Sequence, residues 1–296
     1  MQTQNYSPIT VHEDGDFFRE ALLYTANMTG LNSQLVEKDY FCSVLLSFLF
    51  SDESSLVFKG GTCLSKVYGG FYRLSEDLDF MISTPSGSSR SLRRKTIEPL
   101  KKMIGRISDV LPVFTILENL TGRNNSTQYF AQVQYRSSIR EVPATIKIEI
   151  GLREELLTLP QKGRVKTLLN DPFSRKPAVQ EFTVSCMSPE EAYAEKLRAA
   201  LTRTELAIRD FYDIDYAVQE MGLDLSKKDF LDLVMRKLTV PGNDPVNITS
   251  ARKEVLRRQL ETELKPILRE KDFQRFDLDR AFNLVTQIGS NVLQSI

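Results

Sequence analysis

The feature that most constrains the fold is a change in hydrophobic periodicity near residue 180. Three runs with strand-like alternation lie between residues 113 and 150, and Asp77–Ile82 alternates in the same way. After residue 180 the spacing of apolar residues is mostly helical, and Ser188-Pro189-Glu190-Glu191 has the composition of a helix start. The chain is therefore predicted to be an α+β protein, with an α+β domain over residues 1–180 and a helical domain over residues 181–296.

The pattern also predicts individual elements along the α+β part. A buried helix is expected over residues 34–50, and a short strand at Ser55–Phe58 is expected to lead into a short helix that ends near Tyr68. Residues 151–177 are expected to be irregular, and Pro241–Pro245 should separate two later helices. The remaining predictions are a helix at 88–109 and strands at 77–82, 113–120, 128–135 and 144–150.

Composition limits the chemistry that this chain can perform. It contains a single histidine, so one chain cannot form a multi-histidine metal site, and a Ser-His-Asp or Cys-His mechanism would depend on His12 in an N-terminal segment expected to be flexible. The three cysteines lack CxxC spacing, which disfavours structural zinc. Carboxylates, lysines and a hard metal ion are the remaining candidates for chemistry.

The sequence also bears on localisation. The N-terminus MQTQNYSPIT has neither a basic region nor an apolar stretch, so no signal peptide is predicted. The longest apolar run, Phe41–Phe50, is too short to span a bilayer. Few cysteines suit a reducing compartment. A cytoplasmic protein without a membrane segment is expected.

The first candidate site segment is Lys59-Gly60-Gly61-Thr62, where a strand is expected to end in glycines and open a helix. Such a turn lets backbone N–H groups approach a phosphate, with Lys59 and Thr62 as further donors. Taken alone, paired glycines at a strand–helix junction more often satisfy turn geometry only.

The second candidate feature is a set of acids on predicted strands. Asp77 and Asp79 point to the same strand face, and Glu149 would add a third carboxylate if its strand lies nearby. Oxygen ligands of this kind suit Mg²⁺. Ser75 lies on the same side as the two aspartates, and Lys147 shares the face of Glu149. A lone DxD is more often an exposed strand face, but its combination with the glycine turn indicates phosphoryl or nucleotidyl transfer.

The glycine pair, the Asp77-x-Asp79 pair and a later strand acid together resemble the DNA polymerase β-type nucleotidyltransferase superfamily. The gap from Gly61 to Asp77 is longer than usual, and the third acid is Glu149 where Asp is commoner. The resemblance implies a mixed β-sheet core with flanking helices.

The helical half is similar to the AbiEii/AbiGii toxin family of nucleotidyltransferases. That family adds a strand lysine, a helix lysine followed by arginine, and an R-D-x-x-D motif. The resemblance covers roughly residues 30–220. Some members have an Asp at the position of Tyr193, and in this chain Glu191 or Glu195 could substitute for that Asp. The matching residues here are Glu37-Lys38-Asp39, Lys147-Ile148, Lys196 with Arg203, and Arg209-Asp210-x-x-Asp213.

The resemblance implies roles for these residues, with the helical domain completing the active site. An NTP would bind over Gly60–Thr62, and Asp77 and Asp79 would hold one or two Mg²⁺ ions. Glu149 would complete the metal site or activate the acceptor hydroxyl. Lys196 would bind the triphosphate, and Asp213 would orient that lysine or a base. Further contacts are expected from Lys59, Ser75, Lys147, Arg203, Arg209 and Asp210.

The expected partners are an NTP, an RNA acceptor such as a tRNA 3′ end, and a cognate antitoxin protein. The basic stretches 86–106 and 162–176 could hold an RNA backbone, although a solvated helix face explains the first of them about equally well. Two other functions stay open at this point: a metal-dependent phosphohydrolase or nuclease that uses the same acids, and a non-catalytic module that binds an antitoxin.

Overall fold

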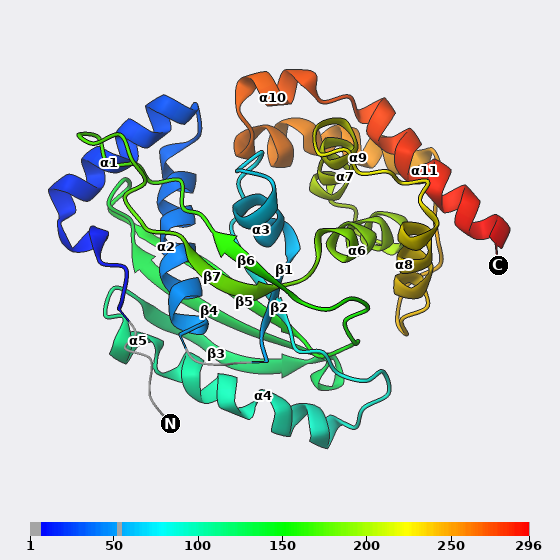
Figure 1. Cartoon of the computed structure of the whole chain (residues 1–296), viewed down its shortest axis with the longest axis horizontal. Helices are drawn as coiled ribbons and strands as arrows, with labels where there is room; N and C mark the ends of the chain where they lie inside the picture. The colour runs from blue at the N-terminus through cyan, green and yellow to red at the C-terminus, as the bar shows by residue number, and fades with distance from the viewer. Residues whose placement is uncertain (1–6, 52–54, 296) are drawn as a thin grey trace. The chain divides into compact units, whose positions relative to one another are not determined.

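The computed structural model of the chain describes residues 7–51 and 55–295 (Figure 1). The first six residues of the N-terminal stretch considered above therefore lie outside the described residues. The helices of the first part are α1 (Gly15–Thr29), α2 (Ser33–Leu49), α3 (Gly60–Cys63), α4 (Arg90–Gly105) and α5 (Ile107–Val110), and α3 continues as a π-helical turn, Leu64–Tyr68. The later helices are α6 (Pro189–Thr202), α7 (Ile208–Glu220), α8 (Lys228–Leu238), α9 (Ala251–Gln259), α10 (Glu270–Arg275) and α11 (Leu278–Ser295).

The described strands form one mixed sheet of seven, in the order β3-β4-β5-β2-β1-β7-β6. Strands β2 and β5 are parallel, as are β1 and β7, whereas the other neighbouring pairs are antiparallel. The strands are β1 (Val57–Lys59), β2 (Leu78–Met81), β3 (Thr115–Arg123), β4 (Gln128–Arg136), β5 (Pro143–Gly151), β6 (Gln161–Val165) and β7 (Phe182–Cys186).

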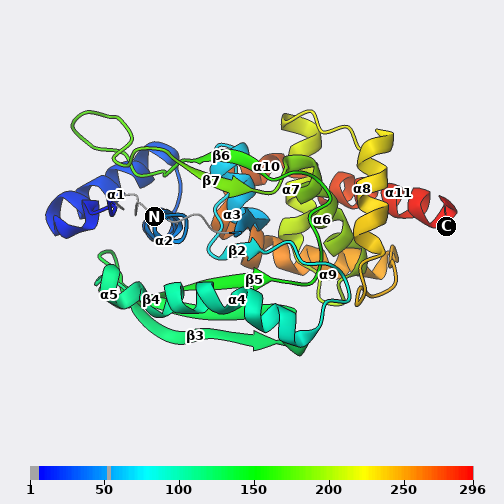
Figure 2. The same cartoon turned by 60° about the horizontal axis from the view of Figure 1, so that its bottom comes forward.

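Side-chain alternation gives β4 and β5 one buried and one accessible face. Along β5, Ile146, Ile148 and Ile150 are fully buried, while Lys147 is exposed and Glu149 is half-buried. The buried face is covered by helices, because the Phe41 ring of α2 lies 4.1 Å from the Tyr135 ring of β4. Figure 2 shows α4 running along β3 and β4. Apolar burial against helices thus fixes which face of the sheet carries the acids.

The chain divides into two compact units. The sheet unit comprises Met1–Leu156 and Pro160–Cys186, and the helical unit comprises Leu157–Leu159 and Met187–Ile296. In the helical unit, the Phe211 and Phe282 rings of α7 and α11 stack with centroids 6.1 Å apart. Arg252 of α9 donates to the carbonyls of Ala200, Leu201 and Arg203, so its guanidinium caps the C-terminal end of α6.

The α+β prediction is confirmed, and most predicted elements are present within a few residues of their expected bounds. The helix start at Ser188 is also confirmed, since its hydroxyl accepts from the Glu191 N–H at 3.2 Å. The prediction for residues 151–177 is wrong in part, because β6 lies within them, and β7 was not predicted either. Both are short, and the sequence of β6, QKGRV, has only Val165 as a large apolar residue.

The expectation of a flexible segment around His12 is also wrong. The His12 ring lies 2.7 Å from the Tyr40 hydroxyl of α2 through Nδ1, and it packs against the Phe41 ring with centroids 5.5 Å apart. Burial lowers the pKa of His12 below its usual 6.5. The sole histidine therefore belongs to the packing of the N-terminal segment. No helix in the described part of the chain is both long enough and apolar enough to span a bilayer.

Candidate active site

The glycine turn is shaped by two charged side chains that press against it. Gly60 has φ +76°, and a Cβ at this position would lie 2.3 Å from the Asp79 carboxylate oxygen Oδ2. A Cβ on Gly61 would lie 2.2 Å from Nη2 of Arg73, which is 2% exposed. Both glycines are thus required by the close approach of an acid and a base, and Gly60 also by its left-handed backbone. The Arg73 contact was not predicted from the sequence.

The acids occupy one face of the sheet in a defined register. Lys59 of β1 is the register partner of Asp79 of β2, and Asp79 is in turn paired with Glu149 of β5. Asp77 lies two residues before Asp79, so it belongs to the same face as Asp79. All three carboxylates are half-buried. The fold therefore brings a lysine and two acids, far apart in sequence, into one row across three strands.

The donor set suits Mg²⁺ in its chemistry. Mg²⁺ is commonly held by one or two carboxylates together with substrate phosphates and water, and Asp77 and Asp79 supply hard oxygen donors at an accessible strand face. Within residues 7–51 and 55–295, no three His, Cys, Asp or Glu side chains lie close enough to hold a metal ion. Phosphate and water oxygens would have to complete the coordination.

Other predicted residues of the sheet unit occupy different environments. Thr62 is 1% exposed and its hydroxyl donates to the Asp77 carbonyl, so in this structure it ties α3 to the start of β2 and is not available as the predicted phosphate donor. Ser75 is half-buried in the segment before β2. Lys147 is exposed on the face of Glu149, in register with Gln132.

The Glu37-Lys38-Asp39 segment of α2 contacts three segments of the sheet unit, two of which adjoin the candidate site. Glu37 accepts hydrogen bonds of 2.6 Å from both the Ser137 hydroxyl and the Ser138 N–H, and burial raises its pKa. Lys38 is paired at 2.8 Å with Glu76, the residue before Asp77. Asp39 forms a buried ion pair at 2.5 Å with Lys66, which follows the glycine turn. Each charge thus anchors a different segment of the sheet unit to α2.

Two cysteines far apart in sequence meet next to the glycine turn. The Cys186 thiol at the end of β7 accepts a hydrogen bond from Cys63 of α3, and it lies 3.1 Å from the Tyr68 hydroxyl. The Cys63 contact is the main cause that lowers the pKa of Cys186 to about 7, whereas burial raises the pKa of Cys63. Both thiols are buried. They contribute to packing beneath the turn.

The predicted residues of the helical unit form a compact ion-pair cluster. Lys196 of α6 contacts Asp210 at 2.6 Å and Asp213 at 3.0 Å, both on α7. The other carboxylate oxygen of Asp210 accepts from Arg203 at 3.0 Å. The side chains of both aspartates are buried, that of Lys196 is 15% exposed, and that of Arg203 is 54% exposed. The R-D-x-x-D motif therefore places both aspartates around the helix lysine.

The remaining helix residues have other surroundings. Arg209 is half-buried and forms no ion pair with any residue that the structure describes. Tyr193, which replaces an Asp of some relatives, is 2% exposed, and its hydroxyl lies 3.1 Å from the Met221 sulfur. Glu191 forms a fully buried ion pair of 2.8 Å with Lys237. It also accepts hydrogen bonds from the N–H groups of Leu157 and Thr158. Its carboxylate is therefore already neutralised.

Comparison with known proteins gives the family. The family model described as "Nucleotidyl transferase AbiEii toxin, Type IV TA system" matches residues 45–284. The chain belongs to this AbiEii family. The match includes the glycine turn, the acids and the helical ion-pair cluster, and it extends past residue 220, where the sequence resemblance ended. The Glu37-Lys38-Asp39 segment lies outside it. The family supports an enzyme of nucleotidyl transfer.

Two solved structures are similar to this AbiEii family member in overall chain course. One is a candidate nucleotidyltransferase from H. pylori, with 14% identity, a TM-score of 0.46, and coverage of 96% of this chain and 95% of the other. The other is JHP933 from Helicobacter pylori, with 14% identity, a TM-score of 0.45, and coverage of 98% and 94%. The search of curated proteins gave no match.

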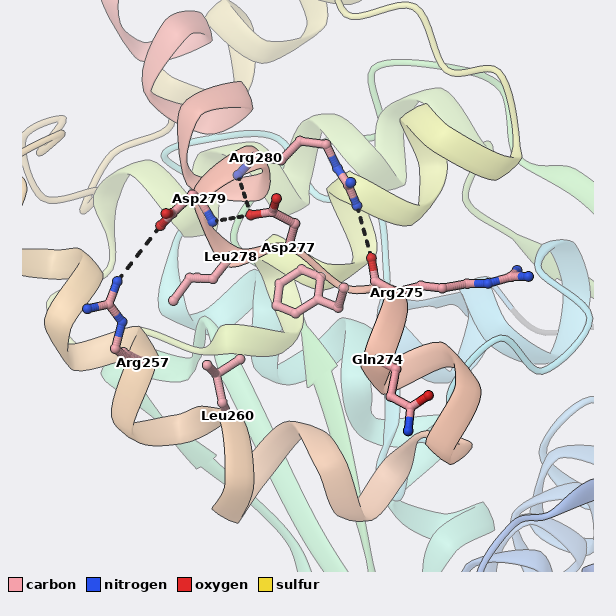
Figure 3. Close-up of a pocket in the computed structure, with 9 residues that line it drawn as sticks. Arg257, Leu260, Gln274, Arg275, Asp277, Leu278, Asp279 and Arg280 are labelled. Atoms are coloured by element: carbon pink, nitrogen blue, oxygen red, sulfur yellow. Dashed lines mark hydrogen bonds and ion pairs between the residues drawn. The ribbon is translucent and has the colours of Figure 1, made fainter.

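The helical unit of this AbiEii family member also contains an open pocket of about 480 Å³ (Figure 3). None of the residues predicted for the active site lines it. Two of its arginines are already paired: Arg280 with Asp215 of α7 at 2.7 Å, and Arg257 with Asp279 at 3.8 Å. The Asp277 side chain accepts from the N–H groups that begin α11, and Figure 3 shows these contacts. The pocket is therefore bounded by a helix cap and internal ion pairs.

Proposed function

We propose that this chain transfers a nucleotide from an NTP to an RNA hydroxyl, with a tRNA 3′ end as the acceptor and Mg²⁺ as the metal ion. The single observation that carries the proposal is the contact of the Gly60 turn with the Asp79 carboxylate, in a strand paired in register with Glu149. A phosphate-binding backbone and two acids on one sheet face are the elements that nucleotidyl transfer needs.

The sheet unit has residues that could bind the NTP and a residue that could activate the acceptor hydroxyl. The triphosphate would lie over the Gly60–Gly61 backbone, with Lys59 as an added cation. Asp77 and Asp79 would hold Mg²⁺, which when bound supplies positive charge to the reacting phosphate and the leaving pyrophosphate. The acceptor hydroxyl attacks the α-phosphorus, the bond from that phosphorus to the bridging oxygen breaks, and pyrophosphate leaves. Glu149 would accept the hydroxyl proton.

Lys196 of the helical unit is proposed as a phosphate-binding residue, because an ammonium group is a compact partner for phosphates. Asp210 and Asp213 hold this ammonium within 3.0 Å and so restrict its position. Arg203 and Arg209 are proposed as further phosphate donors. The ion pairs of Lys196 must loosen when phosphate binds, since its contacts are otherwise occupied by carboxylates.

The family description as a toxin of a type IV system supports a further part of the proposal. We infer that a cognate antitoxin restrains this activity and that both act in the cytoplasm. The test is growth of cells that express the chain alone, the chain with the product of a neighbouring gene, or an Asp79→Asn variant. Growth arrest by the wild-type chain alone, relieved in the other two cultures, is expected. Equal arrest by wild type and variant would contradict a catalytic toxin.

The decisive experiment for the activity is incubation of the full chain with each α-labelled NTP, Mg²⁺ and total RNA, followed by gel separation. Label that migrates with tRNA is expected, and it should disappear with EDTA. RNA loss without label transfer would favour a phosphohydrolase or nuclease. Neither transfer nor RNA loss, together with no Mg²⁺-dependent NTP binding, would favour a non-catalytic antitoxin-binding module.

A further inference from the structure

The sheet face that carries Asp79 and Glu149 continues across the neighbouring strands β4 and β3. Glu149 is paired in register with Phe130 of β4, and Phe130 with Thr121 of β3. The row that begins with Lys59 and Asp79 therefore extends across five strands. At a strand spacing of about 4.8 Å, Phe130 lies roughly 10 Å from Asp79 in the backbone. We define the open face as Arg123, Gln128, Phe130, Gln132, Gln134 and Lys147.

The open face is polar and accessible, unlike the other side of the same strands. Gln128, Gln132 and Gln134 are half-buried, and Lys147 and Arg123 are exposed, whereas the alternating residues Tyr129, Ala131, Val133 and Tyr135 are all at most 2% exposed. A Cβ on Gly151, the register partner of Gln128, would meet only the Phe80 carbonyl oxygen within 4 Å, at 3.8 Å. Space is therefore available above the sheet at this end.

Phe130 is the one residue of the open face that polarity does not explain. It is a half-buried aromatic side chain between glutamines, and the Arg123 guanidinium lies 4.9 Å from its ring centroid. An aromatic ring beside an arginine on a sheet surface is the arrangement on which nucleic-acid bases stack. The uncharged amides of Gln132 and Gln134 offer both donors and acceptors to base edges, whereas Gln128 donates to Glu149 at 3.4 Å and accepts from Asn124 at 2.5 Å.

The open face carries two exposed cations, Arg123 and Lys147, that could contact phosphates. Glu118 of β3, the register partner of Gln132, forms an ion pair of 3.6 Å with Arg123, so a phosphate would compete with this carboxylate for the guanidinium. The cations flank Phe130 on the two strands that border β4, so a chain of phosphates could pass on either side of a stacked base. A single strand fits this face better than a duplex, because stacking on Phe130 requires an unpaired base.

The basic helix α4 lies on the opposite side of the sheet. Its Lys101 ammonium is 5.4 Å from the ring centroid of Tyr129, which belongs to the buried face, and Ile97, Leu100 and Ile104 of α4 are buried. The exposed bases Arg94 and Lys95 therefore do not share the face of Asp79 and Glu149. The open face and the basic stretch 86–106 are therefore two distinct surfaces, and only the open face shares its side of the sheet with the acids.

We infer that the open face binds the unpaired 3′ end of the RNA acceptor, with a base stacked on Phe130 and phosphates on Arg123 and Lys147. The inference rests on the proposed function, because it identifies where the acceptor of that reaction binds. The row from Phe130 through Glu149 to Asp79 would then lead the 3′ hydroxyl toward the acids.

The test measures binding of a labelled single-stranded RNA by fluorescence anisotropy at several salt concentrations, without NTP. Phe130→Leu keeps apolar volume but removes the π face, so about 10-fold weaker binding is expected. Phe130→Tyr should bind like wild type. Lys147→Ala should weaken binding and reduce the number of counterions released on binding, obtained from the salt dependence, by about one. The control Met28→Ala removes a 67% exposed apolar side chain of α1 and should have no effect.

The same variants are then assayed for label transfer, where Phe130→Leu should raise KM for RNA and leave kcat within about two-fold. Wild-type transfer with unchanged RNA binding and KM in Phe130→Leu would overturn the inference while the proposed function stands. Phe130-dependent RNA binding without any transfer would leave the open face intact and refute the proposed function. Two further outcomes would overturn the inference about the open face. One is that RNA binding is lost in the Arg94→Ala/Lys95→Ala double variant but in none of the open-face variants, and the other is that the chain binds an antitoxin but no RNA.

Discussion

Two groups of aspartates in this protein share a chemical type and differ in their surroundings. Asp77 and Asp79 are half-buried on an accessible strand face, next to the backbone of the glycine turn. Asp210 and Asp213 are buried in the helical unit and paired with Lys196. The first group can exchange water for a metal ion or a ligand, whereas the second is already neutralised by cations of the chain itself.

The difference has an energetic reason. An accessible carboxylate keeps much of its hydration, so removing it costs little stability and is expected to affect mainly function. A buried carboxylate with one strong cationic partner cannot be removed without leaving that cation uncompensated. Substitutions at the two groups should therefore separate catalysis from folding.

The largest effect is expected for Asp79→Asn. The change preserves shape beside Gly60 but removes the negative charge, so nucleotide transfer should fall on the order of 1000-fold, with unfolding free energy changed by less than about 1 kcal/mol. Label transfer and denaturant unfolding measure the two quantities. Asp109→Asn, which neutralises an exposed aspartate of α5, is the matched control. Transfer near the wild-type rate would show that Asp79 holds no essential charge.

Asp213→Asn, unlike Asp79→Asn, should lower stability. Lys196 keeps Asp210 as its partner, so the expected loss is about 2 kcal/mol of unfolding free energy, less than for a fully broken buried pair. Urea unfolding of the variant is compared with Asp232→Asn, which alters an exposed aspartate of α8. If Asp213→Asn unfolds at the wild-type urea concentration, the helical cluster is not held together by this charge.

Arg203→Ala tests the exposed side of the same cluster. The side chain is 54% exposed, and its partner Asp210 retains Lys196, so the loss of unfolding free energy should stay below about 1 kcal/mol. Its proposed phosphate contact predicts several-fold weaker NTP binding, measured by equilibrium dialysis. Arg236→Ala, an exposed arginine of α8, should leave NTP affinity unchanged. Unchanged affinity in Arg203→Ala would remove Arg203 from the proposed binding site.

The smallest effect concerns His12, a half-buried titratable group whose ring lies in hydrogen-bond contact with the Tyr40 hydroxyl. Because its pKa is lowered in the folded state, its contribution to stability is fully present above pH 6.5 and is lost as the pH falls through the folded-state pKa. Cys186, with a pKa of about 7, also titrates between pH 7.5 and 5.5, so the contribution of His12 is the difference in pH dependence between the wild type and His12→Gln. His12→Gln should flatten that dependence, and an unaltered slope would assign it to other groups.

Much of the fold was predictable from local sequence because long segments bury one face. The run at β5 alternates strictly and the run at β4 alternates except at Phe130, and the Ser188-Pro189 start of α6 carries its own capping residue. Strand β6 was missed because its five residues include one large apolar side chain, so it is specified by its neighbours in the sheet. Strand β7 has alternating apolar residues, Phe182, Val184 and Cys186, but is only five residues long.

The candidate site was predictable to a smaller extent. Spacing alone pointed to Gly60, Gly61, Asp77 and Asp79, since these residues are close in sequence and their chemistry depends on local geometry. It did not show that Thr62 donates to the Asp77 carbonyl, or that Arg73 and Lys66 lie around the glycine turn. Those contacts join residues 12 to 27 positions apart or depend on burial, which spacing does not encode.

The sequence by itself determined the change from strands to helices near residue 180 and the types of group available for chemistry, because periodicity and composition are local properties. Only the tertiary structure decided which acids stay accessible, which become buried partners of lysines, and that Phe130 lies in one row with Glu149 and Asp79. Register and burial arise from contacts between distant segments, so the same aspartate can remain hydrated in one place and become an internal counter-ion in another.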